Sequence, residues 1–375
     1  MRSLVFLVIS DDLDHLNIES RPIGGSEFQF YSLIHLLQNK YRITCYNKKK
    51  ESVVVEQVLY KNFNELKTDD LAPDTSIIIG RFMPHTESVL FHKIKNNRMY
   101  LWWQDYVSQD SVSSRMPFLI DCSEESKQKY TRMNDKESFK NDILIPLTKT
   151  KQLQHVFNST YSKRNTISLF SNFNLQLESH NQCHFIYNCL YSKQFIDFKR
   201  PSPDEINVNQ IVFASAWTKG VSIILDLFQY ISARDLNFQL VLMSPGYEWA
   251  NVQNFVPSLK EKFGNRIIIH GPCDKKKYSE VISKSLCVMS GRFPETFGCV
   301  FAESYFLGTP VIADVQSGAV KEIIDPTFIV NYDDANEVFQ KLVDLRSRRT
   351  KIHIDLRDEF REEHILQQWI NLIKG

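Results

Sequence analysis

The sequence predicts an α/β protein made of two doubly wound domains. Short apolar runs alternate with stretches of helical periodicity along most of the 375 residues, which is typical of parallel sheets covered by helices on both faces. This alternation loosens once, over residues 185–203, and then restarts, which predicts an interdomain linker there. The chain is also about two and a half times as long as an average domain of ~150 residues.

The first domain is expected to span residues 1–190. Its apolar run at residues 4–9 is too short for a signal-peptide core and lacks a small-residue cleavage site, so it predicts a buried strand. Gly24 and Gly25 follow in a loop, and helical periodicity runs over residues 27–37. Further strands are expected at residues 41–46, 76–79, 99–103, 118–120 and 143–147.

The second domain is expected to span residues 205–354, and an amphipathic helix is expected over residues 355–374. Two such domains in tandem place the carboxyl ends of two sheets, where ligands bind in this class, on either side of a cleft. The expected strands are residues 210–214, 238–243, 266–269, 286–289 and 311–313. The expected helices are residues 221–231, 276–284, 301–307 and 335–345, with another ending near residue 263.

The composition excludes several classes of protein. Hydrophobic residues make up 43% and charged residues 24%, which excludes wholesale disorder. The net charge of +1 provides no overall field for holding a nucleic acid or an anionic membrane, so an anionic ligand needs a local site. No run approaches the ~18 apolar residues of a spanning helix, so we expect a soluble or at most peripherally membrane-bound protein. The seven scattered cysteines, without a C-x-x-C, favour a reducing compartment and a cytoplasmic location.

The most informative segment is residues 293–312, F-P-E-T-F-G-C-V-F-A-E-S-Y-F-L-G-T-P-V-I. A loop after the expected strand at residues 286–289 delivers Glu295, and Thr296, Phe297 and Gly298 open a helix. Free N–H groups and the positive end of the helix dipole make such a start an anion site. Glu303 lies eight residues after Glu295, about two helical turns further along, so both acids face the same side and can accept hydrogen bonds from sugar hydroxyls.

This segment closely resembles the hallmark of the retaining glycosyltransferases of the GT-B fold, family four. That hallmark is a Glu, seven residues and a second Glu within P-E-x-F-G-x-x-x-x-E-x-x-x-x-G-x-P-V-I, and the match runs position by position over about eighteen residues. The resemblance implies two Rossmann-like domains facing across a cleft, with the final helix packed back on the first domain. It further implies that a sugar moves from a nucleoside diphosphate sugar to an acceptor hydroxyl in glycan or glycoconjugate synthesis.

The resemblance also assigns roles in the second domain. Glu303 would hold the ribose hydroxyls of the donor, although it could also be a solvated helix residue. Glu295, with Thr296 and the main chain of Phe297 and Gly298, would hold the donor sugar and its phosphate. In residues 215–220, S-A-W-T-K-G, Ser215 lines the donor loop, and Lys219 would neutralise the charge on the leaving diphosphate unless it is a solvated lysine at a helix start.

Two further segments resemble the family. Gly24 and Gly25, in G-G-S-E, would let the main chain approach the donor diphosphate or the acceptor, where a Cβ would block it. Gly271 and Pro272 follow a strand end and would lie against the nucleotide base. His270, beside them, is more readily explained as a structural histidine. The expected catalytic residues are Glu295, Lys219 and Asp105, the last as a group that orients the acceptor or merely caps a loop.

The chain departs from the family pattern at three places. Gln104 stands where the family often has a histidine, and Gln cannot act as a general acid or base. No arginine occurs over residues 213–215, where many members have one five residues before the lysine. Cys189 replaces a glycine at the domain junction. Gln104 and the missing arginine keep open the alternative of a catalytically silent GT-B scaffold that acts as a binding protein.

We expect neither a metal nor an organic cofactor. Asp12-Leu13-Asp14 spells the acidic pattern of metal-dependent transferases, but it directly follows the first strand, which is the wrong place for that role. The G-x-G-x-x-G fingerprint of a nicotinamide site is absent there. The expected partners are a nucleoside diphosphate sugar and a glycan, glycolipid or glycoprotein acceptor, with no nucleic acid.

Overall fold

The computed structural model describes residues 2–8, 25–47, 51–62, 65–66, 71–80, 97–104, 140–150, 152–177 and 182–375. These residues form two compact units. The first unit comprises the N-terminal strand, the described residues from Ser26 to Tyr187, and Leu366–Gly375. The second comprises Asn188–Ile365 together with Gly25.

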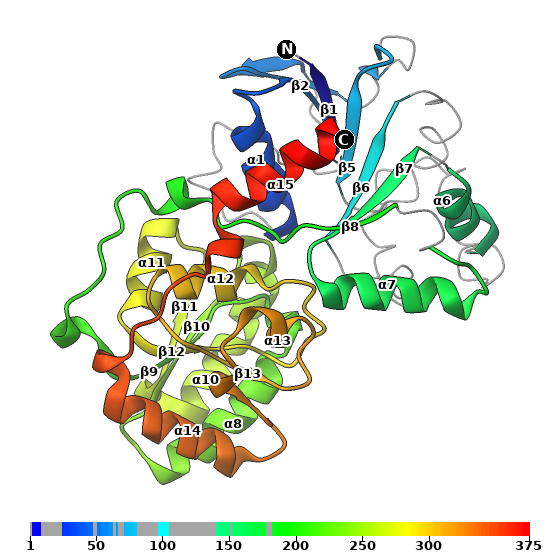
Figure 1. The fold of residues 1–375 in the computed structure, drawn as a ribbon. Coiled ribbons are helices and arrows are strands. Elements are labelled where there is room, and N and C mark those ends of the chain that lie inside the picture. The colour runs from blue at the N-terminus through cyan, green and yellow to red at the C-terminus, as the bar shows by residue number, and fades with distance from the viewer. Residues whose placement is uncertain are drawn as a thin grey trace. The chain divides into compact units, whose positions relative to one another are not determined.

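The first unit contains an eight-stranded sheet in the order β3-β4-β2-β1-β5-β6-β7-β8, in which only the β3–β4 pair is antiparallel (Figure 1). The strand order reverses between β1 and β5. Both of these strands are mostly apolar and are buried on both faces. The strands are β1 (Ser3–Val8), β2 (Arg42–Asn47), β3 (Val53–Val55), β4 (Val58–Asn62), β5 (Ser76–Gly80), β6 (Met99–Trp103), β7 (Leu153–Phe157) and β8 (Cys183–Phe185). The longer helices are α1 (Gly25–Leu37) and α7 (Thr160–Asn172).

Helix α1 packs on this sheet through Phe30. The Phe30 ring meets Trp102 of β6 edge-on at 5.1 Å between centroids. A Cβ added to Gly80, the last residue of β5, would lie 2.5 Å from the same ring. Glycine at this strand end therefore gives α1 room to cover the sheet.

The strand expected at residues 143–147 is wrong, because this segment is helical. A π-helical turn, Lys140–Leu144, leads into α6 (Ile145–Lys149). Leu144 and Leu147 are both buried and lie three residues apart, which is the spacing of one helix face. Pro146 also lacks the N–H that an inner strand would need. The strand expected at residues 118–120 lies outside the described residues.

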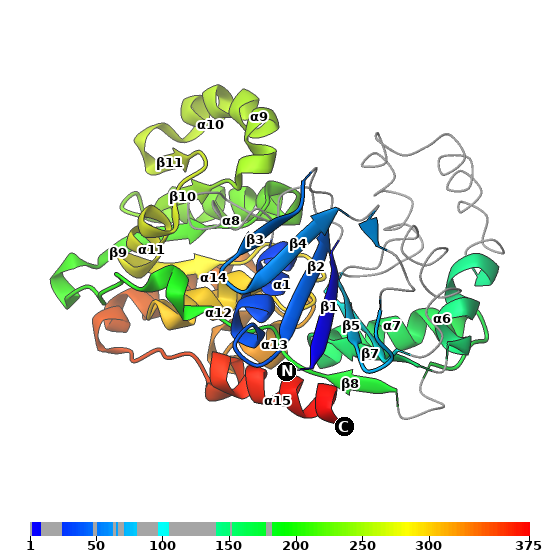
Figure 2. The same ribbon diagram turned by 90° about the horizontal axis from the view of Figure 1, so that it is seen from above.

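The second unit contains a six-stranded, wholly parallel sheet in the order β11-β10-β9-β12-β13-β14, with helices on both faces (Figure 2). Its order reverses between β9 and β12, and ligands bind at such a reversal in doubly wound folds. The strands are β9 (Asn207–Phe213), β10 (Gln239–Met243), β11 (Ile267–His270), β12 (Ser285–Met289), β13 (Val311–Asp314) and β14 (Ile329–Val330). The helices are α8 (Val221–Arg234), α9 (Trp249–Val252), α10 (Val256–Phe263), α11 (Lys275–Ser283), α12 (Cys299–Phe306), α13 (Val320–Ile323) and α14 (Ala335–Arg348).

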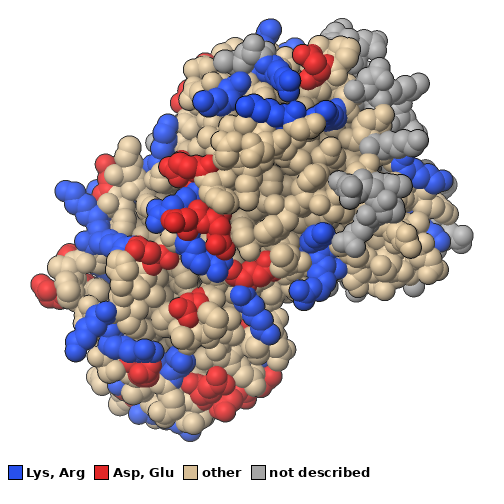
Figure 3. All heavy atoms as spheres, in the orientation of Figure 1, with Lys and Arg blue, Asp and Glu red and all other residues tan. Residues whose placement is uncertain are grey.

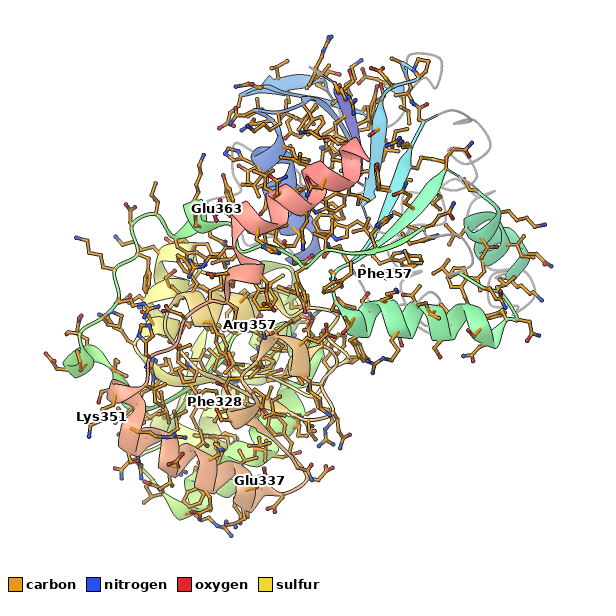
Figure 4. The ribbon with its side chains drawn as sticks, in the orientation of Figure 1. Phe157, Phe328, Glu337, Lys351, Arg357 and Glu363 are labelled. Carbon is orange, nitrogen blue, oxygen red and sulfur yellow. The ribbon has the colours of Figure 1, made fainter. Side chains whose placement is uncertain are left out.

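The final helix, α15 (Glu362–Lys374), begins later than the expected residue 355. Arg357 (labelled in Figure 4) donates to the Glu322 carbonyl, and its guanidinium lies 4.6 Å from the centre of the Phe360 ring. These contacts hold the segment before α15 on the second unit, where it forms only a short 3-10 turn, Asp358–Phe360. Further along, the buried Trp369 belongs to the first unit and meets Trp102 at 5.0 Å between ring centroids.

The surface carries both signs of charge. Lysine and arginine side chains are interspersed with aspartate and glutamate on the face in Figure 3, as the net charge of +1 would suggest. Within the described ranges, no helix combines the length and apolar character needed to cross a bilayer.

A buried histidine links β6 and β7 in the first unit. His155 of β7 is 1% exposed, and the Trp103 Nε1–H donates to its Nδ1 at 3.1 Å. Nδ1 is therefore unprotonated, and the neutral ring carries its proton on Nε2. Burial lowers the pKa of His155 to about 4, partly opposed by a hydrogen bond with the Leu147 main chain.

We predict that His155 makes the protein less stable in mild acid. An unfolded histidine binds a proton below pH ~6.5, whereas folded His155 does so only near pH 4. Its contribution is thus complete above pH ~6.5 and is lost, at about 1.4 kcal/mol per pH unit, as the pH falls toward 4. Denaturant unfolding of His155→Gln between pH 7 and 4 should show a shallower pH dependence than wild type. Equal slopes would contradict this assignment.

Candidate functional site

Two loops lie against each other where the strand order of the second sheet reverses. Residues 214–220 follow β9 and lead into α8, and residues 290–298 follow β12 and lead into α12. A Cβ on Gly291 would lie 2.0 Å from the Lys219 carbonyl oxygen. Gly220 has a φ of 97°, and its Cβ would lie 2.9 Å from the Arg292 nitrogen. Only glycine at both positions permits this approach of two main chains.

The approach of the loops brings Lys219 and Glu295 together. Lys219 Nζ lies 2.6 Å from Glu295 Oε1 and 5.3 Å from the centre of the Phe293 ring. The Glu295 side chain is 12% exposed and that of Lys219 is 35% exposed. The structure thus pairs two of the residues that the sequence singled out separately.

The loop after β13 packs against the main chain of the loop that carries Glu295. The Ala319 N–H donates to the Glu295 carbonyl at 2.7 Å, and a Cβ on Gly318 would lie 2.1 Å from that same oxygen. Gly298 adopts a φ of 79° as α12 begins. Thr296 and Phe297, which lie between Glu295 and Gly298, are buried, so their side chains pack beneath the loop.

Two groups outside the sequence prediction anchor these loops. The Glu248 carboxylate, just after β10, accepts from the Trp217 N–H at 2.6 Å and from Thr218 Oγ1 at 2.8 Å. The Arg292 guanidinium pairs with the fully buried Asp314 and, at 2.8 Å, with Asp333. Glu248 and Arg292 both follow strands that end at the same edge of the sheet. This position after a strand end is the sequence signal that could have indicated a role in the site.

A second lysine–glutamate pair lies at α12. Lys275 Nζ is 2.6 Å from Glu303 Oε1, and the Tyr278 hydroxyl donates to Glu303 Oε2 at 2.6 Å. Burial, followed by the Glu303 carboxylate, raises the pKa of Tyr278 well above its usual value, so its hydroxyl stays protonated and can donate. The sequence prediction missed Lys275 and Tyr278, although their spacing of three places them on one helix face.

Both ion pairs act electrostatically on Cys299, which begins α12. Burial raises the pKa of Cys299, the first residue of this helix, to about 12. Glu303 and Glu295 raise it further, while Lys219 and Lys275 lower it, so all four charges act on one thiol. Two cations and two carboxylates therefore surround the helix that begins at Cys299, and the positive end of its dipole lies among them.

Gly271 and Pro272 lie at the end of β11. A Cβ on Gly271 would meet the Trp249 ring at 3.1 Å, so the indole covers this main chain. Burial, and then Lys277, lowers the pKa of the neighbouring His270, which favours a neutral ring at pH 7. No described contact joins this loop to either ion pair, and its contact with a base stays a prediction.

The predicted residues from the N-terminal part of the sequence are less fully described. Gly24 and Asp105 lie outside the described residues. Gly25 begins α1 and is exposed. Gln104 is buried, and Asn158 Nδ2 donates to its carbonyl at 3.3 Å and to its side-chain oxygen at 3.4 Å. In the part of the chain that the structure describes, no three His, Cys, Asp or Glu side chains cluster as metal ligands.

Residues 209–348 match the model of the family described as glycosyl transferases group 1. This part of the chain is similar to the group 1 glycosyltransferases, and the match covers less than half of the 375 residues. The matched region contains both loops and both ion pairs of the candidate site. A search of the curated proteins gives no match.

Solved structures show that the group 1 region is part of a GT-B fold. HepE of Anabaena, crystallised with UDP and glucose, is 15% identical with a TM-score of 0.64 over 100% of both chains. A glycosyltransferase from Rickettsia africae is 15% identical, with a TM-score of 0.65 over 100% of this chain and 98% of that one. The α,α-trehalose 6-phosphate synthase of Burkholderia multivorans is 10% identical, with a TM-score of 0.66 over 100% and 96%.

We predict that Lys219 and Glu295 are energetically coupled. In a double-mutant cycle with Lys219→Met and Glu295→Gln, the coupling in the free energy of unfolding should be about 1 kcal/mol, because the pair is only partly exposed to water. The matched control is the exposed Lys277–Glu280 pair, 3.0 Å apart on α11, for which about 0.3–0.5 kcal/mol is expected. A coupling no larger than that of the control would contradict the prediction.

Proposed function

We propose that the protein is a retaining glycosyltransferase that moves a sugar from a nucleoside diphosphate sugar to an acceptor hydroxyl. The observation that carries the proposal is the presence of two lysine–glutamate pairs, Lys219–Glu295 and Lys275–Glu303, that both act on the first residue of α12, inside the region that matches the group 1 model. This end of the sheet offers positive charge for a diphosphate and carboxylates for hydroxyls within one site. The HepE structures, with UDP and glucose and with UDP-glucose, support a nucleoside diphosphate sugar as the donor class.

Lys219 and the N–H groups of α12 would bind the diphosphate. Its phosphate oxygens would replace Glu295 as the partner of Lys219 Nζ, because they carry more charge and can also accept from the helix N–H groups. Lys219 would then stabilise the charge that grows on the diphosphate as the sugar leaves. This role requires the ammonium in the transition state, so loss of Lys219 should reduce turnover more than binding.

The carboxylates would bind the two sugars of the donor. Once released from Lys219, Glu295 can accept from hydroxyls of the transferred sugar, and Glu303 can accept from the ribose. As the family resemblance implies, the acceptor attacks the face from which the diphosphate leaves, and a leaving-group oxygen takes its proton. Positioning and charge stabilisation then suffice, without a protein nucleophile. Asp105 remains the proposed group for orienting the acceptor.

The proposal includes transfer without a metal, since Lys219 and the α12 start provide positive charge at the diphosphate. The acceptor would be a glycan, glycolipid or glycoprotein. The scattered cysteines, without a C-x-x-C, support a cytoplasmic location.

The first test is a thermal-shift screen of the full chain against UDP, GDP, ADP, CMP and their sugar conjugates, with and without magnesium. One diphosphate at about a hundredfold excess over its Kd should add ~2.7 kcal/mol of stability, equally in both series. The absence of any shift would favour a silent scaffold. A shift that requires magnesium would contradict metal-independent binding.

Variants separate the proposed roles. Lys219→Met should lower kcat by about 100-fold or more with a smaller effect on nucleotide affinity, as for other groups that stabilise transition-state charge. Glu303→Gln should mainly weaken nucleotide binding. Lys277→Met removes a lysine from the exposed side of α11 and should leave both quantities unchanged. Wild-type kinetics in both site variants would contradict the assignment.

A further inference from the structure

The carboxylate of Glu303 is held by two side chains from one face of α11. The Asp274 side chain caps this helix by accepting from the Lys277 N–H at 2.7 Å. Lys275 and Tyr278 follow one turn apart and reach different oxygens of the same carboxylate, each at 2.6 Å. Two donors fixed on one helix therefore set the rotation of the carboxylate plane.

Aromatic rings hold the Lys275 ammonium in place. Lys275 Nζ lies 4.5 Å from the centre of the Tyr278 ring and 5.4 Å from that of Phe195. The Phe195 ring in turn packs on Phe306 of α12 at 5.3 Å between centroids. The cation thus lies among Glu303 and two rings, which favours a single position for it.

The two donors leave part of the carboxylate available. A carboxylate has about four acceptor sites, two on each oxygen. Lys275 uses a site on Oε1 and Tyr278 a site on Oε2, so each oxygen keeps one. The Glu303 side chain is only 9% exposed, so a ligand can approach these sites from a narrow range of directions. Two adjacent acceptors with a restricted approach suit two adjacent hydroxyls.

We propose that Lys275 and Tyr278 are positioning residues that hold Glu303 as a two-point acceptor for the vicinal hydroxyls of a ribose. The site therefore selects ribonucleotides over 2′-deoxyribonucleotides. This inference rests on the proposed function, because it takes Glu303 to be the ribose ligand. It adds the two residues that orient this ligand and the sugar selectivity that results.

The test measures the affinity ratio between a ribonucleotide and its deoxy analogue. Titration calorimetry with UDP and 2′-deoxy-UDP, and with the corresponding GDP and ADP pairs, gives this ratio for wild type. We expect a preference for the ribonucleotide of about tenfold or more, as for a hydrogen bond to a charged group. Tyr278→Phe, Lys275→Met and Glu303→Gln should each reduce the ratio to about threefold or less.

Three control variants distinguish positioning from a general effect on folding or charge. Lys275→Arg keeps a cation that can reach the carboxylate and should retain most of the ratio. Lys219→Met should weaken both nucleotides about equally and leave the ratio unchanged. Lys277→Met should change neither affinity.

Each outcome supports or overturns the inference. If a diphosphate binds wild type but the ratio is near one, or if Tyr278→Phe and Lys275→Met keep the wild-type ratio, the positioning role is wrong. Tighter ribonucleotide binding by these variants would show that Lys275 and Tyr278 compete with the ribose. If no diphosphate binds wild type, the proposed function fails and the inference with it.

Discussion

The close approach of the loops after β9 and β12 is the constraint on which the candidate site depends. Parallel strands on either side of an order reversal send their connections to opposite faces, so a crevice opens at their carboxyl ends. Here the two loops approach closely, because Gly291 lies against the Lys219 carbonyl. A side chain at Gly291 would separate the loops, and Lys219 could no longer meet Glu295 at 2.6 Å.

Charge balance follows from this geometry. Lys219 is paired with Glu295, and Lys275 is paired with Glu303. The charges of these four side chains therefore sum to zero. A diphosphate must replace a carboxylate as the partner of a lysine. Its own charge and its hydrogen bonds with the helix N–H groups offset the free energy lost when the ion pair is broken. The released or reoriented carboxylates then face hydroxyls. One arrangement thus explains both the pairing within the protein and the class of ligand that would replace it.

The sequence predicted the site best where its pattern was local. The run from Pro294 to Ile312 places a loop, a helix start and a strand at fixed offsets, and the structure has Gly298 before α12 and a strand at Val311. Lys275 and Tyr278 were missed because their link to Glu303 is a tertiary contact across 28 and 25 residues. The segment at residues 143–147 was mistaken because an apolar run of five residues fits a strand or one helical face equally well.

Hydrogen–deuterium exchange of the full chain, with and without the nucleoside diphosphate that stabilises it most, tests the central claim most directly. The claim is that the nucleotide binds where β9 and β12 diverge. Exchange should slow over residues 215–220 and 291–300, where main-chain N–H groups would face the phosphates. Protection confined to the ends of β1 and β5 in the first unit would contradict this account.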